Sequence, residues 1–424
     1  MHDKSSFENL DPIWGGRAPT TRQVGLVPSQ RRTLSATLWS DLLKISPDAQ
    51  AFDQPSLDRH FGGGEGLLPL WIAEPYLDLA PQITEGLASR ATTGWYGYQT
   101  RSAALSENFW AWMQQRHQWD GHGLQTLVSP SVGSSLGILL EQMTQPGDNV
   151  ILQPPVFTDF KTLVNSAQRT VVRNGLLFEN GQYEMDFTGL ETLAAQPATT
   201  ALILCNPHNP VGRVWNQEEL HQLAAICASH QVTVIADEIH ADLILDPHSF
   251  TPFAQAAQGT GVRWAVLHGP IKTFGLAGLC DTLVITDDSE IVERFEHRSS
   301  QLHLTRNNVF ALTAFETAYA HGGPWLDQLL GLMAGNVGIL KETLPPEITL
   351  VELQGTYLAW LDFRDLNMEV PALAHWLGHT ARLALSPGHW FGREGAGFAR
   401  MTIAAPAEQI QDAAERLSRA VAQR

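Results

Sequence analysis

Residues 201–240 read ALILCNPHNPVGRVWNQEELHQLAAICASHQVTVIADEIH, with two apolar runs on either side of an amphipathic stretch. The runs Ala201–Leu204 and Val232–Ala236 are short and continuous, as in strands that are buried on both faces. Between them, Asn216–His230 has the apolar spacing of a helix with one buried face. This order of strand, helix and strand is typical of a parallel sheet that is covered by helices.

The same pattern extends outward on both sides of this stretch and predicts an α/β fold. The apolar runs, taken as strands of one mainly parallel seven-stranded sheet, are Thr126–Ser129, Asn149–Leu152, Thr170–Val172, Ala201–Leu204, Val232–Ala236, Ala265–Leu267 and Leu283–Ile285. From about residue 306 the pattern changes to long helices over Val309–Ala320 and Trp325–Leu344, a strand over Thr356–Leu361 and a terminal helix from Ala407. This change predicts a smaller α+β domain after the large one.

Four segments are expected along the chain. Residues 1–45 form an N-terminal arm, in which 37–45 could be one or two helical turns. Residues 46–75 form a linker or insertion and the start of the small domain, residues 76–305 the large domain, and residues 306–424 the small C-terminal domain. The glycine run at 62–66 (GGGEG) lacks the strand and helix of a dinucleotide-binding motif, so it is interpreted as a flexible connection.

Composition excludes several classes of protein. The chain has 27 Lys and Arg against 44 Asp and Glu, a formal net charge of −17, which disfavours nucleic acid as a partner. No apolar run approaches the roughly 18 residues that span a bilayer, and the N-terminus lacks the apolar segment of a secretory signal. Three cysteines are too few for a disulfide framework. These features favour a cytoplasmic enzyme that acts on a small molecule.

Polar residues that could carry chemistry follow three successive predicted strands. Asn209 lies in a proline-rich turn after the fourth run, Asp237 and His240 follow the fifth, and Lys272 follows the sixth. Because active sites of parallel sheets form just beyond the carboxyl ends of the strands, we expect these side chains to share one crevice.

Lys272 stands out because lysine is scarce. The five lysines are Lys4, Lys44, Lys161, Lys272 and Lys341, and Lys272 alone has this strand-end context. A partly buried amine there could form a Schiff base with a carbonyl compound, since burial lowers the pKa of an amine. Without that context, an ordinary surface lysine would be the better interpretation.

Five ordered motifs resemble those of a known enzyme family. They are CNPHNPVGRVW (205–215), ADEIHADL (236–243), KTFGLAGL (272–279), GTYLAWLDF (355–363) and LSPGHWFGREGAGFARM (385–401). Together they resemble the fold-type I enzymes that depend on pyridoxal 5'-phosphate, within the class I/II aminotransferase-like superfamily. Within it, the chain is most similar to the cystathionine β-lyase and cysteine C–S lyase subgroup. The resemblance runs from about Arg31 to the C-terminus, with an apparent insertion at 42–66.

The resemblance implies a role for each strand-end residue. Lys272 would bind the cofactor aldehyde covalently, and Asp237 would pair with the pyridine nitrogen and keep it protonated. Asn209 would donate a hydrogen bond to the ring hydroxyl, with His240 on the same side of the ring. Arg400 would bind the substrate α-carboxylate through its two-donor guanidinium.

Further contacts to the cofactor are implied around the ring and the phosphate. Phe157 would stack on the ring, and Tyr98 would reach the phosphate of a neighbouring subunit, which implies a homodimer with shared active sites. The turn Ser131, Val132 and Gly133 begins a predicted helix, whose free amides and dipole favour an anion. Taken alone, that turn is better explained as an ordinary helix cap without a ligand.

Two segments depart from the family pattern. Gly269 and Ile271 stand where relatives have hydroxyl residues, so a phosphate donor is lost and the site would depend on Thr273, Ser131 or Tyr98. The segment Trp71–Tyr76 (WIAEPY) is also altered. In relatives it lies toward the substrate entrance, so the substrate side chain is left open.

The resemblance implies β-elimination on an amino acid with a Cβ–S bond, such as cystathionine or an S-substituted cysteine, giving thiol, pyruvate and ammonia. Transamination of an L-amino acid uses the same residues and is the alternative.

Three other interpretations have weaker support. Residues 133–137 (GSSLG) fit the G-x-S-x-G turn of α/β-hydrolases, with Ser135 as nucleophile beside Asp237 and His268. That interpretation gives no role to Lys272 or Arg400. A binding protein that lost its catalysis would be colourless, whereas the enzyme should be yellow. Sixteen histidines form no metal-binding motif, so no metal site is expected.

Overall fold

The computed structural model describes residues 49–62, 64, 66–279 and 281–424. All of these belong to one compact unit. The predicted N-terminal arm and the helical turns at 37–45 lie outside the described residues.

A seven-stranded sheet forms the centre of the fold and confirms the predicted strands. Its strands are β2 (Gln125–Ser129), β3 (Asn149–Leu152), β4 (Thr170–Arg173), β7 (Thr199–Cys205), β8 (Thr233–Asp237), β9 (Trp264–His268) and β10 (Thr282–Thr286). Their order is β2-β10-β9-β8-β7-β3-β4, and only β10 runs antiparallel to its neighbours. Each of the seven apolar runs is a strand of this sheet, so the expectation of a mainly parallel sheet is correct.

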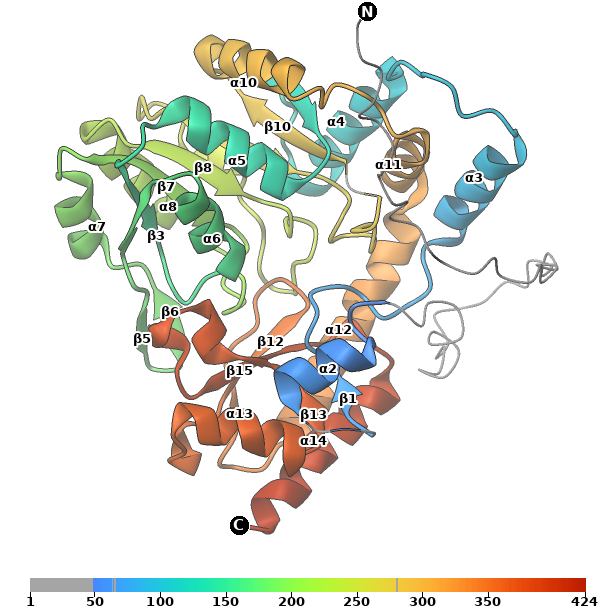
Figure 1. The fold of residues 1–424 in the computed structure, drawn as a ribbon, viewed down its shortest axis with the longest axis vertical. Helices are drawn as coiled ribbons and strands as arrows, with labels where there is room; N and C mark the ends of the chain where they lie inside the picture. Colours follow the sequence, from blue (N-terminus) through green and yellow to red (C-terminus); the bar gives the residue numbers. More distant parts are fainter. Residues whose placement is uncertain (1–48, 63, 65, 280) are drawn as a thin grey trace, which may run out of the picture. The chain divides into compact units, whose positions relative to one another are not determined.

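Helices cover both faces of this sheet. Helices α5 (Val132–Met143), α6 (Thr158–Ser166) and α10 (Ser289–Gln301) share one apolar core with alternate residues of the strands, and α5 and α6 lie in front of the sheet in Figure 1. Helices α7 (Phe187–Ala194), α8 (Gln217–Ser229) and α9 (Phe253–Ala256) pack on β7, β8 and β9 from the opposite side. Strands buried on both faces explain why the apolar runs are continuous.

The C-terminal part has a smaller antiparallel sheet. Its strands, in the order β11-β12-β15-β14, are β11 (Thr349–Leu350), β12 (Leu358–Asp362), β15 (Phe398–Thr402) and β14 (Ser386–Pro387). The helices of this part are α11 (Val309–His321), α12 (Gly323–Thr343), α13 (Val370–His379) and α14 (Ala407–Ala422), with the short turns η1 (Arg364–Leu366), η2 (Gly388–Phe391) and η3 (Arg393–Gly395). The long helices and the terminal helix therefore occur where the sequence predicts them.

The segment expected as a linker or insertion and the start of the small domain contains a helix that packs with the C-terminal part. Asp53 caps α2 (Gln54–Phe61), and Leu57 and Phe61 pack against Trp71. Strand β1 (Leu68–Pro69) then pairs in parallel with β13 (Leu383–Ala384), so the blue N-terminal elements lie beside the red C-terminal ones in Figure 1.

The remaining elements are α3 (Pro81–Thr92), α4 (Ala103–His117) and the hairpin of β5 (Leu177–Glu179) and β6 (Gln182–Glu184). Helices α3 and α4 both pack against α11. The predicted domain boundary at 305–306 falls between α10 and α11 and stays a prediction. In the described part of the chain, none of the helices combines the length and the apolar character that crossing a bilayer requires.

Candidate active site

The carboxyl ends of three adjacent parallel strands form the centre of the candidate site. Strands β7, β8 and β9 lie side by side, with Cys205 opposite Asp237 and Asp237 opposite Leu267. Asn209, His240 and Lys272 lie in the segments that follow these strands, as expected for a site at the edge of a parallel sheet.

The Lys272 amine lies against the segment around residue 73, which is distant in sequence. Lys272 Nζ donates a hydrogen bond to the carbonyl oxygen of Ala73 at 2.8 Å. The same oxygen accepts a hydrogen bond from the Tyr357 hydroxyl at 3.1 Å. Tyr357 is fully buried and Lys272 is half-buried, so the amine lies at the edge of the core with a neutral acceptor.

Asp237 is a buried carboxyl group at the end of β8. One oxygen accepts a hydrogen bond from the backbone N–H of Ile239 at 3.1 Å. Burial raises the pKa of Asp237 to about 6, against the lowering effects of the Ile239 N–H and of the positive charge on Lys272. A cationic group bound beside Asp237 would favour its ionised form.

His240 is a buried, uncharged imidazole. Its ring packs edge to face on Tyr357, with ring centroids 5.8 Å apart. Burial and the nearby charges of Lys272 and Arg400 hold the pKa of His240 well below its usual range. Among the described residues, its Nδ1 atom has no hydrogen-bond partner although it is buried. At this position beside Lys272, the unsatisfied nitrogen is open to a hydrogen bond with a ligand.

Arg400 on β15 is a buried guanidinium whose protein acceptors are all neutral. It donates hydrogen bonds to Asn209 Oδ1 at 3.0 Å, to the Trp71 carbonyl at 2.8 Å and to Ser386 Oγ at 3.2 Å. Its plane lies over the Phe391 ring at 4.8 Å. Burial lowers its pKa to about 10, so it stays charged at neutral pH.

This environment equips Arg400 for an anionic ligand. Among the described residues, no carboxylate forms an ion pair with it, and its buried Nε atom has no partner. A buried charge without a counter-ion is unfavourable unless a ligand supplies one. The pairing with Asn209 also brings together two of the predicted site residues from different sheets.

The start of α5 is open to a small anion. Ser131 is the N-cap and accepts a hydrogen bond from the Ser134 N–H at 3.1 Å. Val132 is the first helical residue. A Cβ at Gly133 would meet only the Ser131 hydroxyl, at 3.9 Å, so the backbone is accessible there. Open amides at a helix start favour an anion such as phosphate.

The Thr273 hydroxyl is engaged by Asp242, and the expected contact of Thr273 with a phosphate stays a prediction. Its buried hydroxyl donates to Asp242 Oδ2 at 2.8 Å and so has no proton left for a phosphate. Trp112 Nε1 donates to the other carboxylate oxygen at 2.8 Å, and His117 Nε2 lies 2.7 Å from it. Although burial opposes it, these hydrogen bonds lower the pKa of Asp242 and keep it ionised.

The buried pair of Glu238 and His268 holds the start of the loop that carries Lys272. Glu238 Oε2 lies 3.0 Å from His268 Nε2, and Oε1 accepts the Phe253 N–H at 2.7 Å. His268 is the last residue of β9, at the start of the loop that carries Lys272 (the lysine loop). Thr273 directly follows Lys272 in that loop. Glu238 and Asp242 therefore attach both ends of the lysine loop to the segment that carries Asp237 and His240.

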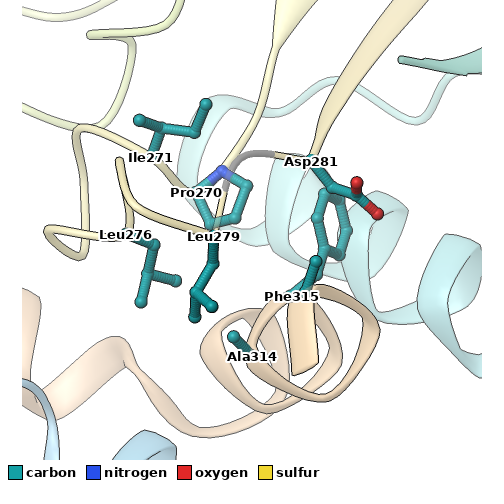
Figure 2. Close-up of a pocket in the computed structure, with 8 residues that line it drawn as sticks. Pro270, Ile271, Leu276, Leu279, Asp281, Ala314 and Phe315 are labelled. Atoms are coloured by element: carbon teal, nitrogen blue, oxygen red, sulfur yellow. The ribbon is translucent and has the colours of Figure 1, made fainter. Parts of the chain in front are cut away.

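The surroundings of Gly269 and Ile271, where relatives have hydroxyl residues, are crowded. A Cβ at Gly269 would lie 3.0 Å from the Asp281 carbonyl oxygen, so any larger residue would crowd the backbone. Ile271 faces a cavity of only about 10 Å³ beside Pro270, Leu276 and the α11 residue Ala314 (Figure 2). The lining is mainly apolar, with the carboxylate of Asp281 at one side.

Phe157 and Tyr98, the two aromatic residues expected to contact the cofactor, differ in their exposure to solvent. Phe157 is half-buried before α6 and packs edge to face on Phe160, with ring centroids 5.5 Å apart. Tyr98 is 86% exposed and lies against the Arg306 guanidinium at 4.4 Å. Its expected contact with a neighbouring subunit stays a prediction.

The hydrolase interpretation does not fit this geometry. Ser135 is fully buried, and its hydroxyl lies 3.1 Å from the Ser131 carbonyl oxygen and 3.2 Å from the Thr282 hydroxyl. His268, its supposed base, is paired with Glu238. The described residues also hold no group of three or more histidine, cysteine or acidic side chains that could bind a metal.

Several contacts were missed from the sequence. Tyr357 and Asp242 lie inside the quoted motifs GTYLAWLDF and ADEIHADL, and an acidic residue in a buried run is a usable signal. The acceptor role of the Ala73 carbonyl has no such signal, because it depends on a long-range backbone contact.

A lysine and a buried carboxyl group at the carboxyl edge of a mainly parallel sheet, facing a buried arginine of the smaller sheet that has no carboxylate partner among the described residues, are typical of enzymes that bind amino-acid-like molecules. The chain belongs to the class I and II aminotransferases, since the family model described as "Aminotransferase class I and II" matches residues 71–417. The resemblance noted from the motifs is thereby confirmed.

Three known proteins illustrate the relationship. The chain is 36% identical to cystathionine beta-lyase PatB of Bacillus subtilis (strain 168), over 84% of this chain and 92% of that protein. It is 31% identical to protein MalY of Escherichia coli (strain K12), over 82% and 90%. The crystal structure of cystalysin from Treponema denticola, which contains a pyridoxal 5'-phosphate cofactor, is similar with a TM-score of 0.81 and 30% identity. The match covers 93% of this chain and 98% of cystalysin.

Proposed function

We propose that this protein is a pyridoxal 5'-phosphate-dependent carbon–sulfur lyase. It would cleave the Cβ–S bond of cystathionine or an S-substituted cysteine and release thiol, pyruvate and ammonia. The carrying observation is the grouping of Lys272, Asp237 and the unpaired Arg400 in a chain that is 36% identical to a cystathionine beta-lyase.

The side chains present fit this cofactor. Lys272 would hold the aldehyde, Asp237 the pyridine nitrogen, and Asn209 and His240 the ring hydroxyl side. The unpartnered Nδ1 of His240 and the raised pKa of Asp237 are both features that a polar, cationic ring would satisfy. Phe157 is half-buried and available as the stacking aromatic.

The phosphate would bind at the start of α5. The open backbone at Gly133, the N-cap Ser131 and Val132 supply the anion-binding turn. Since Gly269, Ile271 and Thr273 offer no free hydroxyl proton, Tyr98 of a second subunit would complete the set of donors.

Each residue then has a defined task. When bound, the cofactor supplies an aldehyde that joins amines and a protonated ring that takes up the electron pair left on the substrate Cα. Arg400 binds the α-carboxylate and fixes the orientation of the substrate. Lys272 Nζ accepts the proton from Cα as general base. Asp237 stabilises the positive ring nitrogen during this step.

Elimination follows when Cβ carries a sulfur leaving group. The electron pair from the broken Cα–H bond forms the Cα–Cβ double bond, and the Cβ–S pair leaves with the thiolate. The unsaturated amine then adds water and gives pyruvate and ammonia, so no oxidant or reductant is needed.

The alternative is transamination, which the name of the matched family keeps open. Incubation of the holoenzyme with an S-substituted cysteine distinguishes the two. Thiol and pyruvate without an added keto acid support the lyase, and a keto acid that forms only with an amino acceptor supports the aminotransferase. Lys272→Ala serves as the inactive control.

The proposed assembly is a homodimer with shared active sites. Trp95, Tyr96 and Tyr98 are 62%, 52% and 86% exposed, and an exposed aromatic group of this kind is typical of an interface. Sedimentation of the holoenzyme should show a dimer, whereas a fully active monomer would refute the shared site. The cytoplasmic location expected from the sequence stays a prediction.

A further inference from the structure

A cavity of about 290 Å³ adjoins the candidate active site. Its walls include Phe157, the proposed ring-stacking residue, and Phe391, the aromatic that lies under the Arg400 guanidinium. The two walls are joined directly, since the Val156 N–H donates to the Phe391 carbonyl oxygen at 3.0 Å. The cavity therefore shares Phe157 with the proposed ring site, and its Phe391 wall contacts the guanidinium proposed to bind the substrate carboxylate.

The charge of this cavity is opposite to that of the protein. Among the described residues that line it, Lys161, Arg173 and Arg393 are basic and none is acidic. The chain as a whole has a formal charge of −17 and only five lysines. A local excess of positive charge within an acidic protein attracts anions to that one place.

Nearby groups leave part of this positive charge free. Glu394 is the carboxylate beside the cavity, and it pairs with Arg173 and lies 3.6 Å from Arg393. One carboxylate is thus shared by two guanidinium groups, while Lys161 adds a third positive charge. Burial lowers the pKa of His389, another lining residue, so it stays neutral at neutral pH.

The start of α6 adds to this preference. Phe157 is the N-cap of α6 and provides no side-chain acceptor for the first amides, and Thr158 lines the cavity as the first helical residue. Uncapped amides at a helix start favour an anion. Beside them, the Trp390 and Phe391 rings provide apolar surface.

We propose that this cavity binds the sulfur-linked part of the substrate and selects a substituent with a short apolar stem and a terminal carboxylate. The inference rests on the proposed lyase function and names its substrate class. The stem would pack on the aromatic walls, and the carboxylate would lie among Lys161, Arg173 and Arg393. Lys161 and Arg393 are exposed, so salt screens their charges. The preference for a carboxylate substituent should therefore weaken at high salt.

The test compares three cysteines that carry S-substituents of similar length: carboxyethyl, propyl and aminoethyl. For the holoenzyme, kcat/KM should be about tenfold higher for carboxyethyl than for propyl, and lowest for aminoethyl. Lys161→Glu and Arg393→Glu should each reduce the carboxyethyl-to-propyl ratio about tenfold. Lys341→Glu, an exposed residue of α12 with the same charge change, should keep the ratio of the unaltered protein.

Two outcomes separate the failure of this inference from failure of the lyase function. If propylcysteine is cleaved and the ratio is near one, or is insensitive to both substitutions, the cavity inference is overturned and the lyase stands. If none of the three releases thiol and pyruvate, the lyase fails. In that case, calorimetry measures the affinity of the holoenzyme for the same three compounds. Equal affinities for the three would overturn the cavity inference.

Discussion

The Lys272 amine donates a hydrogen bond to the Ala73 carbonyl oxygen at 2.8 Å, across 199 residues of sequence. The contact joins the loop after β9 to the segment that precedes α3. Since the acceptor is neutral, no ion pair has to be broken at this contact when the amine takes on another role. The central residue of the site is therefore positioned by backbone, with Tyr357 as a second donor to the same oxygen.

Replacing Lys272 tests its role as the cofactor-binding amine. Lys272→Ala should lose the visible colour of the bound cofactor and at least about a thousandfold in kcat, because both the covalent attachment and the general base are removed. Absorbance spectra and pyruvate release measure the two effects. Lys341→Ala on α12 is the matched control and should keep both. A coloured, active Lys272→Ala protein would show that the amine is misassigned.

Arg400→Lys tests the proposed carboxylate site. A lysine keeps the charge but lacks the two parallel donors, so kcat/KM should fall about 10- to 100-fold, mainly through a higher KM. Arg294→Lys, on the exposed face of α10, should leave the kinetics unchanged. An unaltered KM in Arg400→Lys would place the carboxylate elsewhere.

The pH dependence of stability reports on Asp237 in the cofactor-free protein. Its pKa is raised from 3.8 to about 6, so the folded state binds the proton more tightly than the unfolded state. Stability should therefore fall as the pH rises from about 4 to about 6, by at most about 3 kcal/mol. Asp237→Asn cannot titrate and should be free of this decline. Urea unfolding at several pH values checks it, and parallel profiles for the two proteins would contradict it.

Asp242 should be important for stability. Asp242→Ala leaves Trp112, Thr273 and His117 without their acceptor in a buried place, at a cost of about 2–4 kcal/mol in the free energy of unfolding. Asp327→Ala breaks only an exposed ion pair with Arg116 and should cost below about 1 kcal/mol. Equal midpoints of urea unfolding for the two variants would argue against a structural role of Asp242.

The sheet and the strand-end residues could be predicted because both depend on local pattern. Continuous apolar runs mark strands buried on two faces, and parallel strands bring their carboxyl ends to one edge. That logic alone places Asn209, Asp237 and Lys272 near each other. The helix at Gln54–Phe61 was missed because a neighbouring glycine run suggested a flexible linker, although its stability comes from packing on Trp71.

The direction of the Thr273 hydroxyl could not be predicted from the sequence. A hydroxyl beside the lysine matches the family pattern, but its direction depends on Asp242, which is 31 residues away in sequence. The cavity beside Phe391 was likewise not predictable, because its walls come from β3, β4, α6 and the segment before β15. Contacts of this kind are set by tertiary packing and not by local spacing.

The stoichiometry of products from cystathionine tests the central claim most directly. The holoenzyme, without any added keto acid, should release thiol and pyruvate in equal amounts, and Lys272→Ala should release neither. A keto acid that retains the intact sulfur side chain, and that forms only when an amino acceptor is added, would contradict the lyase and identify an aminotransferase.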